Sequence, residues 1–316
     1  MQDYSYIKHK PQNKLFFKWC ILLFFILLLL GFIKRNFGNA NQEITSPLPQ
    51  VGGLEKSIIS FFSQKPKDSR ILLANIKKLT DAVGGSWSIY VYDLSNDQGF
   101  GINETTIYNA ASVNKIPLLA SLYYLAGKGE INLDQQVTLQ AEDIQDYGTG
   151  SIRYDPPGTT YSIKTLARLM IEKSDNTAAY IIGRQIIGMD KIQKLVEDWG
   201  LTQTDMENDK TSLVDMAKLL TKMYQKEITS EPLTLEMLGF MDKSDFEDRI
   251  PGQIPKEIKI YHKTGDGPGN IHDIGIVMLD KHPFIIGFFT ADITDNKTAT
   301  STIARISKMV FEFMKS

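Results

Sequence analysis

The sequence contains very little cysteine and histidine. Its single cysteine, Cys20, lies inside a long apolar run, which excludes an intramolecular disulfide and a metal site built on cysteine. None of the four histidines has the spacing of a His-Glu-x-x-His zinc motif; they are His9, His262, His272 and His282. We therefore expect no metal site.

The sequence also lacks clustered positive charge and internal repeats. The 35 lysines and arginines are scattered and are balanced by 37 acidic residues, which gives a net charge of -2. Such a chain lacks the basic surface of a nucleic-acid-binding protein, and no repeat of fixed period indicates a solenoid or a propeller. With 42% apolar residues, the composition is typical of a globular protein.

One long apolar run stands near the N-terminus, within residues 15–35. Its length approaches the roughly 20 residues that a membrane-spanning helix needs. Four lysines precede it, at positions 8, 10, 14 and 18, which favours a cytoplasmic N-terminus. Gly38 and Ala40 would suit cleavage of a signal peptide, but Lys34 and Arg35 directly after the run argue against it.

These features predict four segments. We expect a cytoplasmic tail at 1–14, a transmembrane signal anchor at 15–35 and a juxtamembrane linker at 36–65 that is rich in Asn, Gln, Ser, Pro and Gly. Residues 66–316 then form a single domain outside the cytoplasm, in the periplasm or at the cell surface.

The hydrophobic pattern of this domain predicts strands at both ends and helices between them. Helices are expected at 70–83, 165–173, 177–187, 190–199, 211–224 and 298–314, and Ser112 is expected to stand at the start of another. Strands are expected at 86–94, 257–263, 274–280 and 284–291, the last two forming a hairpin. This order predicts an α/β (α+β) fold, in which an antiparallel sheet from both ends of the domain is flanked by helices and carries a mostly helical middle subdomain.

Three short motifs occur in order, namely SVNK at 112–115, SDN at 174–176 and KTG at 263–265. A serine at a helix start lies near the positive end of the helix dipole, and a lysine one turn later can take its proton when neutral. Ser112 and Lys115 could therefore form a nucleophile and its base. Each motif alone also has an ordinary structural explanation, as a capping serine, a polar turn or a charged strand end, but the three together in order favour catalysis.

This motif set resembles the class A β-lactamase-like serine hydrolases of the penicillin-recognising superfamily, from about Arg70 to the C-terminus. The matches include KSDNTAAY, DRIPG and HKTGDGPG. The resemblance implies catalytic roles for Ser112, Lys115, Ser174 and Lys263, and no metal or organic cofactor. It assigns substrate binding to Asn176, Thr264, Gly265 and Asp266. In this family pattern Asp175 ties down its turn, and the backbone N–H groups of Ser112 and Asp266 form the oxyanion hole.

Two features depart from the family pattern. Class A enzymes carry a long Ω-shaped loop with a Glu-x-x-Leu-Asn motif, whose glutamate activates the deacylating water, whereas only LTQTDMENDK occupies positions 201–210 here. Glu207 is then the candidate deacylation base; the other candidates are Asp205, Asp146, Asp143 and Lys115. Asp266 replaces the usual small hydroxyl residue and is expected to repel an anionic substrate.

Three functions therefore remain open. The first is a membrane-anchored enzyme that opens a β-lactam or a related amide through a Ser112 acyl-enzyme. The second is a D-alanyl-D-alanine peptidase or penicillin-binding protein that acts on peptidoglycan. The third is a β-lactam sensor or cell-wall-binding module without turnover. In each case we expect a monomer that binds a β-lactam or peptidoglycan-type substrate and no nucleic acid.

Overall fold

The computed structural model describes residues 68–316. The predicted tail, anchor and linker therefore lie outside the described residues. Between residues 68 and 316, the helices are too short or too polar for any of them to cross a bilayer.

A five-stranded antiparallel sheet forms the centre of the fold, with the strand order β2-β1-β9-β8-β7. The strands are β1 (Ser86–Asp93), β2 (Gln98–Ile102), β7 (Ile260–Gly267), β8 (Asn270–Val277) and β9 (Phe284–Ala291). β1 pairs with β9 along its whole length, from Ser86 opposite Ala291 to Asp93 opposite Phe284. This pairing confirms the prediction that both ends of the domain contribute to one sheet.

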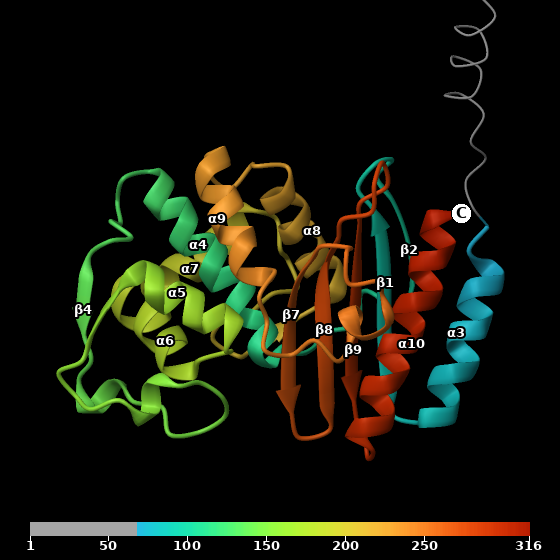
Figure 1. The fold of residues 1–316 in the computed structure, drawn as a ribbon, viewed down its shortest axis with the longest axis horizontal. Helices are drawn as coiled ribbons and strands as arrows, with labels where there is room; N and C mark the ends of the chain where they lie inside the picture. The colour runs from blue at the N-terminus through green and yellow to red at the C-terminus, as the bar shows by residue number, and fades with distance from the viewer. Residues whose placement is uncertain (1–67) are drawn as a thin grey trace, which may run out of the picture. The chain divides into compact units, whose positions relative to one another are not determined.

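The central strand β9 is buried on both faces because helices cover both sides of the sheet (Figure 1). Phe284, Ile286 and Phe288 pack with α3 (Arg70–Val83) and α10 (Asn296–Lys315). The alternate residues Ile285 and Phe289 belong to the core formed with the helical region. Because successive side chains of a strand point to opposite faces, alternate apolar residues of β9 pack against the helices on each face of the sheet.

The middle of the chain is mostly helical, as predicted, and lies beside β7 and β8 (Figure 1). Its helices are α4 (Lys115–Gly127), α5 (Ile163–Glu172), α6 (Asn176–Tyr180), the π-helical η4 (Ile181–Ile187), α7 (Met189–Asp198), α8 (Leu213–Tyr224) and α9 (Glu231–Met241). The 3₁₀ turns are η1 (Ala111–Asn114), η2 (Ala141–Asp143), η3 (Ile152–Tyr154) and η5 (Ile250–Gln253). Two small sheets pair β3 (Tyr108–Asn109) with β6 (Lys210–Thr211), and β4 (Gln136–Thr138) with β5 (Thr160–Ser162).

Several helix boundaries differ from the sequence prediction. Ser112 lies in the 3₁₀ turn η1, and α4 begins only at Lys115. The helix expected from 177 to 187 is divided into α6 and the π-helical η4. The helix expected from 211 begins at Leu213, because Ser212 caps its first turn by accepting the Asp215 N–H and the preceding residue pairs in β6.

Candidate active site

The turn η1 and the first residue of α4 bring Ser112 and Lys115 together. The Nζ of Lys115 lies 3.1 Å from the Oγ of Ser112. Pro117 is tolerated two residues later because it stands in the first turn of the helix, where no backbone N–H donor is needed. The Lys115 side chain is only 5% exposed, so its ammonium form is largely deprived of water.

The turn between α5 and α6 delivers the second motif. Ser174 adopts a left-handed backbone conformation with φ of 51°. The carboxylate of Asp175 holds the turn through three backbone hydrogen bonds. One carboxylate oxygen of Asp175 accepts the N–H of Ala178, and the other accepts the N–H groups of Ser151 and Ile152. The prediction that Asp175 ties down its turn agrees with these contacts.

Lys115 also contacts this second turn. Its Nζ lies 2.7 Å from the Ser174 carbonyl oxygen, 3.2 Å from the Ser174 Oγ and 2.7 Å from the Asn176 Oδ1. Asn176 in turn donates from its Nδ2 to the carbonyl oxygen of Tyr147. These contacts fix the lysine between the first and second motifs.

The third motif comes from β7, the strand at one edge of the sheet. Lys263 is buried, and its Nζ donates to the Ser174 Oγ over 3.0 Å and to the Thr264 carbonyl oxygen over 2.9 Å. The Ser174 hydroxyl thus contacts both lysines. Polar contacts run without interruption from Ser112 through Lys115 and Ser174 to Lys263, across three segments that are far apart in the sequence.

Gly265 allows β7 to approach the turn that carries Ser112. A Cβ at this position would lie 3.1 Å from the Ala110 carbonyl oxygen and 3.2 Å from the Val113 nitrogen, which is closer than a side chain comfortably tolerates. The family resemblance predicts that this glycine contributes to substrate binding. In the structure its neighbours are Ala110 and Val113, so its visible role is to pack β7 against the turn that carries Ser112.

Burial lowers the pKa of both lysines. The pKa of Lys115 falls well below its usual range, chiefly through burial and secondly through the charge of Lys263, although Asp175 and Asp209 oppose the shift. Burial also lowers the pKa of Lys263 to about 7, against the attraction of Asp273 and Asp266. Both lysines therefore lose a proton more readily than a solvated lysine does, and Lys263 is partly protonated near neutral pH.

A cavity of about 470 Å³ opens over these groups. Its lining includes Ser112, Lys115, Ser174, Asn176, Thr264 and Asp266. Ser112, Lys115 and Ser174 line this cavity, and Lys263 contacts Ser174 from outside the lining. Such a group of contacting serines and lysines is suited to nucleophilic acyl transfer.

Comparison with known proteins identifies the family. The family model described as the β-lactamase enzyme family matches residues 72–314. The chain belongs to this family. It is therefore a serine hydrolase of the penicillin-recognising superfamily, with the fold that the family implies.

Individual members of the family are distant relatives. β-Lactamase VEB-1 of Pseudomonas aeruginosa is 24% identical over 75% of this chain and 89% of its own length. The solved structure of PBP-A is 26% identical, with a TM-score of 0.71 over 77% of this chain and 95% of its own. A PBP-A mutant solved as an acyl-enzyme complex with penicillin G gives 25% identity and a TM-score of 0.72, over 78% of this chain and 98% of its own.

The segment 201–210 is short in this β-lactamase-family protein. Of its acidic side chains, one lines the cavity and the others do not. The Glu207 side chain is 66% exposed and faces Arg184 at 3.7 Å, and it is not among the residues that line the cavity. The Asp205 carboxylate accepts hydrogen bonds from the backbone N–H groups of Glu207 and Asn208. Asp209 does line the cavity.

The other candidate bases of the sequence prediction lie away from Ser112. Asp143 is buried and accepts the N–H of Gln140 and a hydrogen bond from Gln185. Asp146 is exposed, and neither of these two aspartates lines the cavity. Lys115 is the one member of that group that contacts Ser112.

Asp266 stands at the rim of the cavity and is paired with a buried arginine. Its Oδ1 accepts a hydrogen bond of 2.6 Å from the Nη2 of Arg249, whose side chain is only 6% exposed, while the Asp266 side chain is 48% exposed. The Nη1 of Arg249 donates to the carbonyl oxygen of His272. Asp266 is thus paired with the cation of Arg249.

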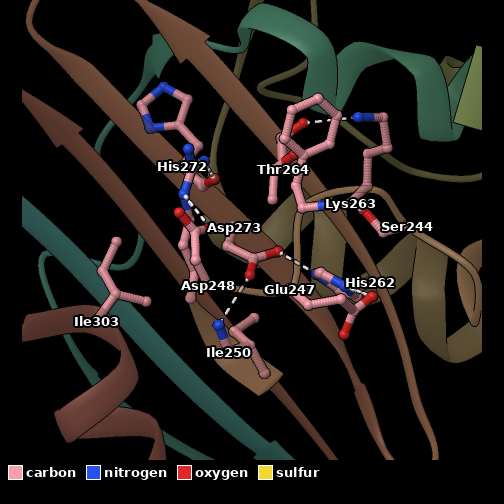
Figure 2. A network of polar contacts seen from close by, with 12 residues as sticks. Ser244, Glu247, Asp248, Ile250, His262, Lys263, Thr264, His272, Asp273 and Ile303 are labelled. Carbon is pink, nitrogen blue, oxygen red and sulfur yellow. Dashed lines mark hydrogen bonds and ion pairs between the residues drawn. The ribbon is translucent and has the colours of Figure 1, made fainter. Parts of the chain in front are cut away.

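A second polar network lies behind this strand (Figure 2). His262, the neighbour of Lys263 on β7, is bonded to Asp273 at 2.9 Å and faces Glu247 at 3.4 Å. The second oxygen of Asp273 accepts the N–H of Ile250. His272 and Asp273, although adjacent on β8, are each bonded to different partners.

His272 is held in one neutral form. Its Nε2 lies 2.9 Å from the Asn109 carbonyl oxygen, and its Nδ1 accepts the Thr290 N–H at 3.1 Å. Burial lowers its pKa to about 4. Across residues 68–316, no group of three or more His, Cys, Asp or Glu side chains is placed to hold a metal ion.

Sequence reasoning missed Asp209 and Arg249. Asp209 is one of three acids within LTQTDMENDK, and only the fold of the segment decides which of them turns inward. Arg249 lies in the DRIPG segment, which matches the family pattern but to which the resemblance assigns no role. Arg249 pairs with Asp266, the residue after the KTG motif that departs from the family pattern. The two positions are 17 residues apart, and the sequence alone does not indicate that they meet.

Proposed function

We propose that this protein is an acyl-transfer enzyme of class A β-lactamase type, which opens a β-lactam or a related amide through an ester on Ser112. The observation that carries the proposal is the contact of 3.1 Å between Ser112 and a buried lysine whose pKa is lowered. A lysine that is uncharged near neutral pH can accept the serine proton, which a solvated lysine cannot do.

The contacts suggest a sequence of proton transfers. The Ser112 Oγ attacks the carbonyl carbon of the substrate while its proton passes to the Lys115 Nζ. The backbone N–H groups of Ser112 and Asp266 stabilise the negative oxygen that develops. Ser174 then donates its hydroxyl proton to the leaving nitrogen and is reprotonated by Lys115 or Lys263, both of which contact its Oγ.

The remaining groups orient the substrate. Asn176 is placed to bond a side-chain amide, since it lines the cavity beside Lys115. Thr264 lines the same cavity at the KTG end, where we assign it and Lys263 to a substrate carboxylate. Gly265 and Asp266 complete this end, the glycine by allowing close packing and the aspartate by its backbone N–H.

A penicillin-binding protein or D-alanyl-D-alanine peptidase is the second candidate. Two observations favour it: the segment 201–210 is short, with Glu207 outside the cavity, and PBP-A is a relative in structure and sequence. Such a protein uses the same acylation machinery and releases the acyl group slowly. A sensor that is acylated once is the limiting case.

An assay with a chromogenic cephalosporin distinguishes these functions. The full-length protein in detergent is mixed with the compound, and both the coloured product and the protein mass are followed. Steady turnover with a transient adduct is the expected result for a β-lactamase. A burst of one equivalent with a persistent adduct assigns the protein to the penicillin-binding or sensor class. An adduct that still forms on Ser112→Ala would show that Ser112 is not the nucleophile.

We also propose that residues 15–35 anchor the protein in a membrane, with residues 66–316 on the extracytoplasmic side. The support is the apolar run and the lysines that precede it. We propose further that the protein acts as a monomer.

A further inference from the structure

Residues 204–211 form a short hairpin that docks on the nucleophile turn. Asp205 and Lys210 exchange backbone hydrogen bonds of 2.8 and 2.9 Å. The strand β6 that follows pairs with β3, placing Lys210 opposite Asn109. The hairpin therefore ends directly beside the residues that precede Ser112.

Asp209 makes the closest contacts between this hairpin and the turn. Its backbone has φ of 53°, a left-handed conformation that aspartate and asparagine tolerate better than most residues. Its carbonyl oxygen accepts the Ala110 N–H at 2.8 Å, and its Oδ2 accepts the Ala111 N–H at 3.2 Å. Its Oδ1 accepts a hydrogen bond from the amide of Asn114. The carboxylate is thus held by residues on both sides of Ser112 in the sequence.

Asn114 supplies an independent observation. Its side chain is 8% exposed, and it lines the same cavity as Ser112 and Asp209. While its Nδ2 is bonded to Asp209, its Oδ1 is buried and has no hydrogen-bond partner among residues 68–316. A buried carbonyl oxygen without a donor is costly, and a water molecule is the usual donor in a polar cavity of this kind.

The charges around Asp209 suit a base. Burial raises the pKa of the Asp209 carboxyl, against the hydrogen bonds from Ala111 and Asn114 and the charges of Lys210 and Lys115. A carboxylate with a raised pKa binds a proton more strongly than a solvated one, so it is better matched to proton abstraction near neutral pH.

We propose that Asp209 is the general base that deacylates Ser112, with Asn114 holding the attacking water. This inference rests on the proposed function, because it requires an ester on Ser112. Asp209 takes one proton from the water while the water oxygen bonds to the ester carbonyl carbon. The bond between that carbon and the Ser112 Oγ then breaks, and the proton passes from Asp209 to Oγ. The serine hydroxyl and the free carboxylate are both restored.

The variant Asp209→Asn tests this role. Asparagine tolerates the same backbone conformation and keeps a side-chain oxygen that can accept the bond from the Asn114 amide, so the hairpin is expected to stay docked. The full-length protein is acylated with benzylpenicillin, the free compound is removed, and adduct formation and decay are followed by mass. We expect acylation within about threefold of the wild-type rate and deacylation slower by about 10²-fold or more.

Two further variants complete the test. Asn114→Ala removes the second water ligand and is expected to slow deacylation with little effect on acylation. Glu207→Gln alters the exposed acid of the same hairpin, and its adduct is expected to decay at the wild-type rate. Thermal melting of each variant reports whether the fold is kept.

The outcomes separate this inference from the proposed function. If the wild-type protein forms no adduct, the proposed function fails and the inference fails with it. If the adduct forms but decays equally fast in Asp209→Asn, or does not decay even in the wild type, only the role of Asp209 is overturned. Equal losses of acylation and deacylation in Asp209→Asn would make it a positioning residue, and a deacylation loss in Glu207→Gln would transfer the role to Glu207.

Discussion

The negative charge of Asp266 is expected to affect which substrates the cavity accepts. Its carboxylate is half exposed at the cavity rim and is paired with the buried Arg249. A substrate that carries its own carboxylate at the KTG end meets a negative group and an arginine already engaged. The residue type predicts this repulsion, and the pairing means that Arg249 is not free to attract the substrate carboxylate.

We predict that Asp266→Ser speeds acylation by an anionic β-lactam. Two unit charges about 4 Å apart interact by roughly 1–4 kcal/mol near a protein surface, so a gain of about tenfold is expected. The acylation rate with benzylpenicillin is compared with the rate for its uncharged ester. The ester serves as the control and should react equally well with both proteins. A similar change for both compounds would exclude an electrostatic origin.

At the scale of single residues, the sequence predicted which side chains of the candidate site lie together better than it predicted their surroundings. The positions of Ser112, Lys115, Ser174 and Lys263 follow from short motifs whose spacing is local. The inward turn of Asp209 depends on a left-handed backbone conformation and on pairing with a strand about 100 residues away. No periodicity in a ten-residue polar segment encodes that choice.

Two neighbouring strands share a charged network beneath the site. Burial by itself lowers the pKa of His262 on β7, but the attraction and hydrogen bonds of Asp273 on β8 and of Glu247 outweigh it and raise the pKa to about 9. The charged imidazolium therefore links β7 to β8 and to the segment before η5 (Figure 2). Lys263, the next residue along β7, is positioned by the strand that this network holds.

We predict that the contribution of His262 to stability depends on pH. Because its pKa is raised in the folded state from 6.5 to about 9, the contribution is fully present below pH 6.5 and is lost as the pH rises through 9. The shift corresponds to about 3 kcal/mol at most. Urea unfolding of the wild type and of His262→Gln should give the largest difference in unfolding free energy at low pH.

His272 provides the matched control for this experiment. Its pKa is lowered to about 4 in the folded state, so the unfolded chain binds the extra proton between about pH 4 and 6.5. The wild-type advantage over His272→Gln should therefore grow as the pH rises through this range, opposite to the behaviour of His262. A difference for His262→Gln that stays constant from pH 5 to 9 would contradict the assignment.

Most of the longer elements were predictable from the sequence, whereas α9 and the strands β2 to β6 were not. Apolar alternation and helical periodicity located the long strands β1, β8 and β9 and the helices α3 and α10. The short strands β3 to β6 have only two or three residues each, too few for any period to show. Their pairing is set by tertiary contacts, which is why the docking of the hairpin could not be anticipated.

For the whole molecule, the apolar run at 15–35 predicts that the full chain stays with membranes. We expect it to remain in the membrane pellet after alkaline carbonate extraction and to be released by detergent, because the run can span a bilayer. Changing Leu28 and Leu29 to Arg should move the protein to the soluble fraction, whereas Leu28→Ile with Leu29→Ile should not. A shortened soluble product that begins after Ala40 would instead show a cleaved signal peptide.

The central position of β9 has a consequence for the order of folding. Residues 284–291 separate the β1-β2 pair from the β7-β8 pair in the strand order, so a growing chain that ends before them has two unconnected hairpins. Pairing of such distant segments is slow because a long loop must close first. The serine near the beginning of the domain is made early in synthesis, and the scaffold around it is completed only when the last strand and α10 arrive.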